Sequence, residues 1–253
     1  MKHSKFSIIC LLAVSLLFSL SATAFADTCG EHSPFDVNEN GESYGDYFQA
    51  MEAGVDPDLI AAQGVDGTRG YVRASDLEEP MPESPDAALA LQAERRASGY
   101  TGRYINLYAS DGLTVIGSFF ISMPDFTPDT SARSEVMYSS PNTLTLPDCT
   151  ATGWSAIQQV IGGVKFYSIV QTNQVVSAGR VASRSMLYNE DTGDLVKSTS
   201  YGYNDSSGTY FPHSATYFTT SGNYYCRGLG KVMHPDGVWG TMSLGMTPIC
   251  DAD

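Results

Sequence analysis

Hydrophobic and polar residues alternate most clearly near the end of the chain, over residues 238–247. One face of this run carries Val238, Gly240, Met242, Leu244 and Met246. Comparable runs, separated by turn signals such as Pro235-Asp236-Gly237, lie near 174–189, 194–203, 209–219 and 223–233. Turn signals about 8–12 residues apart are typical of antiparallel sandwiches and barrels. We therefore predict a mainly β chain whose residues 151–253 form an antiparallel meander, folded as a sandwich or partial barrel.

Ahead of this region the pattern predicts a small α+β cassette over residues 59–122. Ser84 is a typical N-cap residue, Pro85 suits the first helical position, and Gly99 ends a helix predicted over 85–97. Asp111-Gly112 between two apolar runs predicts a hairpin over 104–121. Two segments have less regular patterns. Residues 123–150 are interpreted as a linker or long loop, and 153–170 fit either a helix near 154–161 or a strand near 164–170.

The first 26 residues have the organisation of a secretory signal peptide. Lys2 and Lys5 precede an apolar run over 6–20, and Ala24-Phe25-Ala26 supplies a small-x-small cleavage pattern. No later stretch approaches the ~20 consecutive apolar residues of a membrane span. We therefore expect a secreted, extracellular or cell-surface protein with no transmembrane insertion after signal cleavage.

Charge divides the remaining chain unevenly. The sequence has 14 Lys and Arg against 28 Asp and Glu, a net charge of −14. Sixteen acidic but only four basic residues fall between Asp27 and Tyr100. Such a balance argues against a nucleic-acid partner, because phosphate binding needs clustered Lys and Arg. It also predicts that residues 27–58 form a largely disordered acidic segment.

Four cysteines remain after the predicted cleavage, namely Cys29, Cys149, Cys226 and Cys250. An even number in an exported chain favours disulfides, so we predict two. Cys149 fits Cys226 or Cys250 equally well, which leaves the pairing open. No cysteine pair has C-x-x-C spacing and the histidines are scattered, so no metal site is predicted.

Three motifs resemble a cassette found in uncharacterised exported proteins of Gram-positive bacteria. They are G-Y-V-x-x-x-D-L at 70–77, P-x-S-P-x-x-A-L at 82–89 and L-Y-x-S-D-G-x-T-V-I-G at 107–117. The G-Y-V sequence also resembles the closing strand of bacterial SH3-type modules. The resemblance implies a bacterial, extracytoplasmic protein and brings no activity with it.

Motifs for catalysis or cofactor binding are scarce, and no cofactor is predicted. Residues 36–41 resemble half of a calcium loop, but Tyr47 stands where a bidentate carboxylate is needed, so an acidic solvated segment is the preferred interpretation. His213 and His234 each have the chemistry of a general base. A histidine at a strand end is more often structural, and no catalytic residue is assigned.

Aromatic residues are concentrated in the predicted C-terminal strands. As binding residues we select Tyr201, Tyr203, Tyr217, Tyr224 and Trp239. An exposed row of such rings would bind a cell-envelope glycan or protein, whereas the same residues in cross-strand pairs would only stabilise the sheet. The preferred function is a non-catalytic binding protein. The alternative is a secreted hydrolase using dispersed carboxylates such as Asp194, Asp205 or Asp236.

Overall fold

A computed structural model describes residues 34–125 and 134–253. The predicted signal peptide and Cys29 lie outside the described residues. Strands make up 51% of the described residues and helices 11%, so the prediction of a mainly β fold with a partial barrel is confirmed. Within the described ranges, no helix has the length and apolar character needed to cross a membrane.

Two sheets contain all the named strands. The larger follows the order β1-β2-β3-β4-β5-β6-β12-β11-β15-β16, with β13 paired to β11 and β17 paired to β15. Its strands are β1 (Asp36–Val37), β2 (Ser43–Gly45), β3 (Leu59–Gln63), β4 (Arg69–Arg73), β5 (Gly102–Tyr108), β6 (Val115–Ser122), β11 (Val181–Asn189), β12 (Leu195–Thr199), β13 (Gly202–Tyr203), β15 (Asn223–Met233), β16 (Trp239–Leu244) and β17 (Cys250–Asp251). The smaller sheet contains β7 (Met137–Tyr138), β8 (Asn142–Thr145), β9 (Thr150–Val160), β10 (Gly163–Val176) and β14 (Gly208–Phe218).

Five strands of the larger sheet close into a partial barrel. β3, β4, β5 and β6 pair in sequence, and β12 completes the ring by pairing in parallel with β6 and, at Leu195, with Ala62 of β3. Apolar side chains fill its interior, including Val72, Leu107 and Phe119. Because β12 belongs to the chain after residue 150, the predicted cassette and the predicted β-domain share one sheet, and residues 34–253 form one compact unit.

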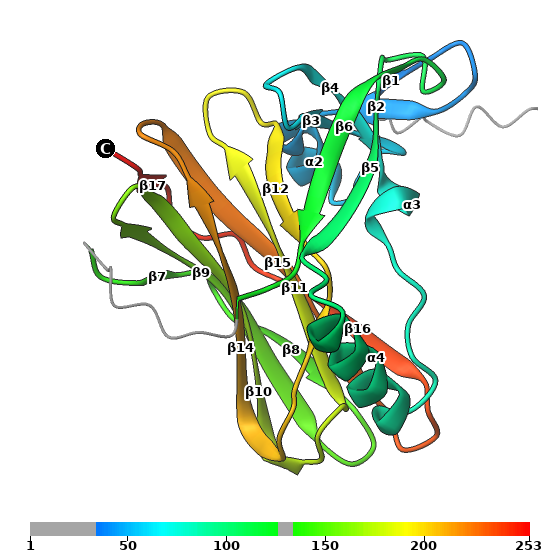
Figure 1. The fold of residues 1–253 in the computed structure, drawn as a ribbon, viewed down its shortest axis with the longest axis vertical. Coiled ribbons are helices and arrows are strands. Elements are labelled where there is room, and N and C mark those ends of the chain that lie inside the picture. Colours follow the sequence, from blue (N-terminus) through cyan, green and yellow to red (C-terminus); the bar gives the residue numbers. More distant parts are fainter. Residues whose placement is uncertain (1–33, 126–133) are drawn as a thin grey trace, which may run out of the picture. The chain divides into compact units, whose positions relative to one another are not determined.

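The smaller sheet packs against β11, β15 and β16 as a sandwich (Figure 1). One buried cluster between the sheets includes Val170, Val232 and Leu244, and the other includes Phe166 and Leu187. Strands do not pair strictly in chain order, because β10 pairs with β14 and β11 pairs with β15. Turn signals locate strand ends but do not specify partners, so the sequence predicts the strands better than their order.

Helices are few and are placed by clear cap signals. α4 (Pro85–Ala97) begins after the N-cap Ser84, whose hydroxyl accepts a hydrogen bond from Ala87 N, and it has the predicted bounds. α2 (Tyr47–Ala53) has a capping box built by Asp46 and Gln49. The short α3 (Ala74–Leu77) follows β4 directly. The helical alternative for residues 154–161 is wrong, because β9 pairs with β10 along this stretch.

Residues 34–58, predicted to be largely disordered, instead contain β1, β2 and α2. Specific partners hold several acidic side chains of this segment. Glu42 forms an ion pair with Arg73, and Asp56 pairs with Arg227 of β15. Charge counting along the chain misses such partners because they are distant in sequence. Residues 123–150, predicted as a linker or loop, contain the short strands β7 and β8, which pair with β9.

Candidate functional site

The predicted exposed row of tyrosines does not form. Tyr201, Tyr203 and Tyr224 are all buried. Tyr201 and Tyr203 pack with Ala88 of α4, and Met81 lies against the same cluster. The segment containing α4 therefore covers the face that the strand pattern leaves exposed, and for these two tyrosines the prediction of an exposed surface is wrong.

Two cations lie against the ring of Tyr201. The Arg184 guanidinium carbon is 5.2 Å from the ring centroid and Lys231 Nζ is 4.6 Å from it. Both cations reach the same carboxylate, because Glu78 lies 2.6 Å from Arg184 Nη2 and 3.6 Å from Lys231 Nζ. Burial raises the pKa of the Tyr201 phenol above its ordinary value. We call these four residues the Tyr201 cluster. Its ring is buried and its two cations share one carboxylate, which suits a structural role.

The other two predicted binding residues are only partly buried. Trp239 donates a hydrogen bond from its indole Nε1 to the carbonyl oxygen of Pro82, at 2.8 Å. Its ring lies 6.1 Å from that of Tyr203, so Trp239 packs beside the covered tyrosines. Tyr217 contacts Tyr224 edge to face, with ring centroids 5.5 Å apart. Of the five residues, Tyr217 is the one that lines the cleft described below.

The three described cysteines are free thiols, so the prediction of a disulfide among them is wrong. Cys149 belongs to one buried cluster between the sheets, whereas Cys226 and Cys250 belong to the other. Burial raises the pKa of Cys226 to about 12 and that of Cys250 to about 11. These thiols are therefore protonated at neutral pH and behave as small apolar side chains.

Neither histidine considered in the sequence is placed as an accessible base. His213 is buried, with Nδ1 2.7 Å from Ser183 Oγ, and burial lowers its pKa to about 4. It is neutral at pH 7 and lies inside the sandwich. His234 belongs to the turn between β15 and β16, where its N–H donates to Val238 O at 2.7 Å.

The three carboxylates considered for a hydrolase have separate partners. Asp194, in the turn between β11 and β12, pairs with Arg69 Nε at 2.6 Å. Asp205 pairs with Arg96 at 3.2 Å. Asp236 accepts a hydrogen bond from Val238 N within its own turn, at 3.1 Å. Asp194 lies at the end of β11 opposite to the other two, so the structure does not bring the three together.

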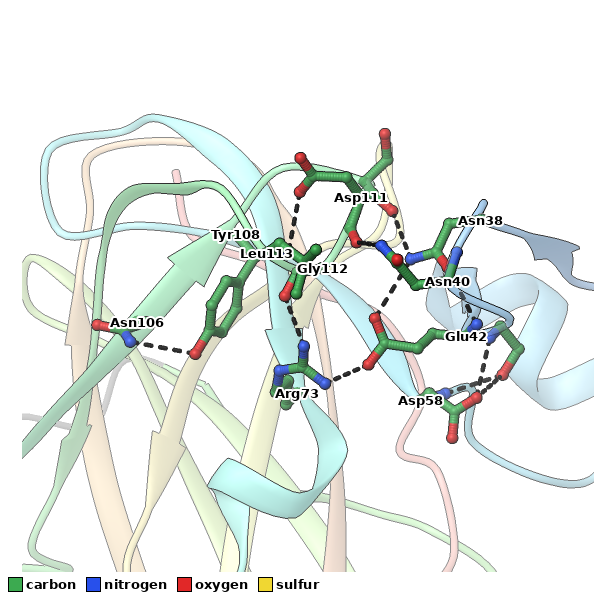
Figure 2. A network of polar contacts seen from close by, with 12 residues as sticks. Asn38, Asn40, Glu42, Asp58, Arg73, Asn106, Tyr108, Asp111, Gly112 and Leu113 are labelled. Carbon is green, nitrogen blue, oxygen red and sulfur yellow. Dashed lines mark hydrogen bonds and ion pairs between the residues drawn. The ribbon is translucent and has the colours of Figure 1, made fainter.

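The calcium-like segment 36–41 forms a hydrogen-bonded turn that Figure 2 shows in detail. Asn38 Oδ1 accepts from the backbone N–H groups of Asn40 and Glu42, each at 3.0 Å. The two asparagine side chains then donate to the hairpin of β5 and β6, from Asn38 to Ser110 O at 3.0 Å and from Asn40 to Asp111 O at 2.8 Å. In the described ranges, no group of three or more His, Cys, Asp or Glu side chains is arranged to hold a metal. The amides of this turn therefore attach it to the barrel.

An aromatic cleft of about 400 Å³ lies beside the barrel, where β12 changes its neighbour from β3 to β6. A β-bulge creates the site. Tyr188 of β11 pairs with Leu195 and Leu187 pairs with Lys197, so Val196 is an extra residue on β12. The bulge sends Leu195 into the barrel interior and directs Lys197 to the opposite face.

Aromatic residues form the main wall of the cleft. Tyr104 of β5 and Phe120 of β6 are directly opposite in the antiparallel pair, with ring centroids 4.8 Å apart. Tyr104 is 68% exposed, so one side of the pair faces solvent. Tyr217 lines the cleft from β14 of the smaller sheet. The site is therefore a concave surface between the barrel and the edge of the sandwich.

The turn between β3 and β4 supplies the remaining wall. Val65 donates its backbone N–H to Ser118 O of β6 at 3.0 Å, which holds the turn against the barrel. Gly64 comes so close to the same carbonyl oxygen that a β-carbon would lie only 2.9 Å from it. A side chain at this position would therefore displace the turn, and Gln63 and Val65 would lose their places in the cleft wall.

Lys197 is the charged group of this cleft among the described residues. Its Nζ lies 5.3 Å from the ring centroid of Phe120, within the range of a cation–π contact. Burial lowers the pKa of Lys197, and the negative charge of Asp125 opposes this shift. Lys197 is therefore a partly dehydrated cation beside an exposed aromatic pair. Its surroundings disfavour the charge, unlike those of an ordinary surface lysine.

A second hollow, of about 280 Å³, lies between α2 and β16. Its cation is Arg227, which makes a bidentate ion pair with Asp56 at 2.7 and 3.0 Å. Because Arg227 already pairs with a carboxylate, it is less available to a ligand than Lys197 is in the aromatic cleft. We therefore select the aromatic cleft as the candidate site.

Comparison with known proteins adds no assignment. No protein-family model matches the chain, and no curated protein matches it. Sequence reasoning identified Tyr217 but not Tyr104, Phe120 or Lys197. Strict alternation places Lys197 on the same strand face as Leu195, and the bulge at Val196 breaks that alternation. A lysine directly after two apolar residues of a predicted strand was the available signal.

Proposed function

We propose that this chain is a secreted, non-catalytic protein that binds a cell-envelope glycan in the aromatic cleft. The observation that carries the proposal is the solvent-facing pair of Tyr104 and Phe120 with the ammonium of Lys197 over the second ring. Aromatic rings present a flat apolar face to the C–H groups of a sugar, and polar groups at their edge bond its hydroxyls.

The size of the cleft favours a glycan over a folded protein partner. About 400 Å³ lies within the 300–1,000 Å³ usual for small-ligand sites. A stable protein–protein interface instead buries roughly 800 Å² on each partner and is comparatively flat. The polar side chains at the edge of the cleft, Gln63 and Tyr217, are suited to hydroxyl groups.

Retention on immobilised Gram-positive cell-wall glycan tests the proposal. We expect the wild-type protein to be retained and Tyr104→Ala to elute during washing, because the substitution removes the aromatic ring on which the sugar stacks. Tyr138→Ala is a matched control, since Tyr138 is 52% exposed on β7 and lies outside the cleft. Thermal melting establishes that both variants remain folded.

Equal retention of Tyr104→Ala and wild type would contradict the proposed site. Loss of retention in Tyr138→Ala alone would indicate that the glycan binds to the smaller sheet and not in the aromatic cleft. No retention of the wild-type protein on any envelope glycan would contradict the proposed function itself.

A further inference from the structure

We infer that the aromatic cleft selects a largely neutral glycan that carries a single carboxylate, and that Lys197 binds this carboxylate. The inference rests on the proposed function and specifies its ligand class. It depends on where Lys197 lies, on the charges around the cleft and on the contrast with Lys231, which has a carboxylate partner.

The position of Lys197 couples sugar stacking to charge recognition. Tyr104, Phe120 and Lys197 lie side by side on β5, β6 and β12, because Tyr104 pairs with Phe120 and β12 runs parallel to β6. A sugar ring stacked on the aromatic pair therefore has its substituents next to the ammonium group. A charge-assisted hydrogen bond to a carboxylate is roughly twice as strong as one between neutral groups.

The charges around the cleft limit the ligand to few negative groups. Lys197 is the charged residue among the described residues that line it, and the acidic Asp125 acts on it from nearby. The chain as a whole has a net charge of −14. A polyanion gains one local attraction and meets repulsion from the rest of the surface. A neutral glycan with one carboxylate gains the attraction with little repulsion.

Lys231 shows how this chain arranges a lysine with a structural role. Both lysines lie against an aromatic ring, at 5.3 Å for Lys197 and 4.6 Å for Lys231. Lys231 also pairs with Glu78, 3.6 Å away. Lys197 forms no ion pair with a carboxylate of the described residues, and it lines a cleft open to solvent. A ligand carboxylate bound at Lys197 would play the part that the Glu78 carboxylate plays for Lys231, namely that of its ion-pair partner.

Isothermal titration calorimetry with three saccharides tests the inference. The first probe is the disaccharide N-acetylglucosaminyl-N-acetylmuramic acid, which has one carboxylate. The second is its carboxyl methylamide, which is neutral and nearly the same shape. The third is tetragalacturonate, a polyanion. Each is titrated into wild type, Lys197→Met, Lys197→Arg and the charge-matched control Lys231→Met.

We expect wild type to bind the free acid about tenfold more tightly than the methylamide, and tetragalacturonate more weakly than the acid. Lys197→Met should lose this preference while it keeps its affinity for the methylamide. Lys197→Arg and Lys231→Met should retain the preference. Retention by Lys197→Arg indicates that a cation at this position is what the ligand requires.

Equal binding of the acid and the methylamide by wild type would overturn the inference and leave the proposed function intact. A preference that persists in Lys197→Met would also overturn it, because the carboxylate would then bind elsewhere. Binding of none of the three probes would contradict both the inference and the proposed function, since the neutral disaccharide itself tests stacking on Tyr104 and Phe120.

Discussion

The Tyr201 cluster and the aromatic cleft both place a lysine against an aromatic ring, yet their surroundings differ. Tyr201 is buried beneath the segment that contains α4, and its two cations share Glu78. Tyr104 faces solvent, and Lys197 beside Phe120 forms no ion pair with a described carboxylate. The residue types are alike in the two regions. A structural contact differs from a candidate binding site in whether another segment buries the ring and whether a carboxylate pairs with the lysine.

This difference has an energetic meaning. A dehydrated cation that loses its carboxylate partner is strongly unfavourable for stability, because its charge is then uncompensated. Without that partner, dehydration disfavours the charged form, as the lowered pKa of Lys197 indicates. Residues kept at some cost to stability are frequent at functional sites. The variants below measure this contrast.

The largest effect is expected at the Tyr201 cluster. Tyr201→Ala removes a fully buried ring and should lower the free energy of unfolding by about 3–5 kcal/mol. Tyr104→Ala removes a mainly exposed ring and should change it by less than about 1 kcal/mol. Urea denaturation of both variants measures the two values. Similar losses would contradict the assignment of one aromatic site to stability and the other to binding.

Tyr201→Phe is an internal control for this comparison. The Tyr201 hydroxyl is buried and has no hydrogen-bond partner among the residues that the structure describes. Its removal should therefore not lower the free energy of unfolding, because no hydrogen bond is lost and the desolvation cost of an unpaired hydroxyl disappears. A large loss in Tyr201→Phe would show that the hydroxyl has a partner, such as a buried water.

An intermediate effect is expected from Glu78→Gln, which removes the shared counter-charge of Arg184 and Lys231. Arg184 is almost fully buried, so an unbalanced charge there is unfavourable. Because the Glu78 side chain is itself 46% exposed, solvent screens the pair and the expected loss is only about 1–2 kcal/mol. Denaturation of Glu78→Gln beside the exposed Glu39→Gln measures it, and equal stability of the two variants would contradict the pairing.

The smallest effect has the opposite sign. Lys197→Met replaces a dehydrated charge by an apolar side chain of similar length, so it should raise the free energy of unfolding by about 0.5–1 kcal/mol. The same variant should lose its preference for the carboxylated disaccharide. A destabilised Lys197→Met that retained the preference would indicate a structural lysine.

The pH dependence of this stabilisation has a defined direction. The folded-state pKa of Lys197 is lower than the ordinary value of 10.5, so the unfolded chain binds more protons in the interval between the two. Below the folded-state pKa, the charged Lys197 lowers the free energy of unfolding by its full amount. This destabilisation decreases as pH rises toward 10.5. The stability difference between Lys197→Met and wild type should shrink over that interval, which denaturation from pH 7 to 10 measures. A difference that grew with pH would contradict the direction of the shift.

Local signals in the sequence predicted local structure well. Ser84, Pro85 and Gly99 determined the bounds of α4 because capping depends on neighbouring residues. Asp111-Gly112 located the hairpin of β5 and β6 for the same reason, since Gly112 adopts the positive φ that the turn requires.

The candidate site depended on contacts between distant segments. No local pattern indicates that residues 78–91 cover Tyr201, or that β12 would pair with both β3 and β6. The disulfide prediction was wrong for a similar reason: an even cysteine count carries no information about distance, and the fold places Cys149 and Cys226 in different clusters.

An NMR titration that observes the aromatic and lysine side chains compares the two regions in one experiment. With N-acetylglucosaminyl-N-acetylmuramic acid as the ligand, we predict that the signals of Tyr104, Phe120, Lys197 and Tyr217 shift together as ligand is added. The signals of Tyr201 and Lys231 should stay unchanged, because Tyr201 is buried and Lys231 is already paired with Glu78. Shifts at the Tyr201 cluster without shifts at Tyr104 and Lys197 would contradict the assignment of the aromatic cleft as the binding site.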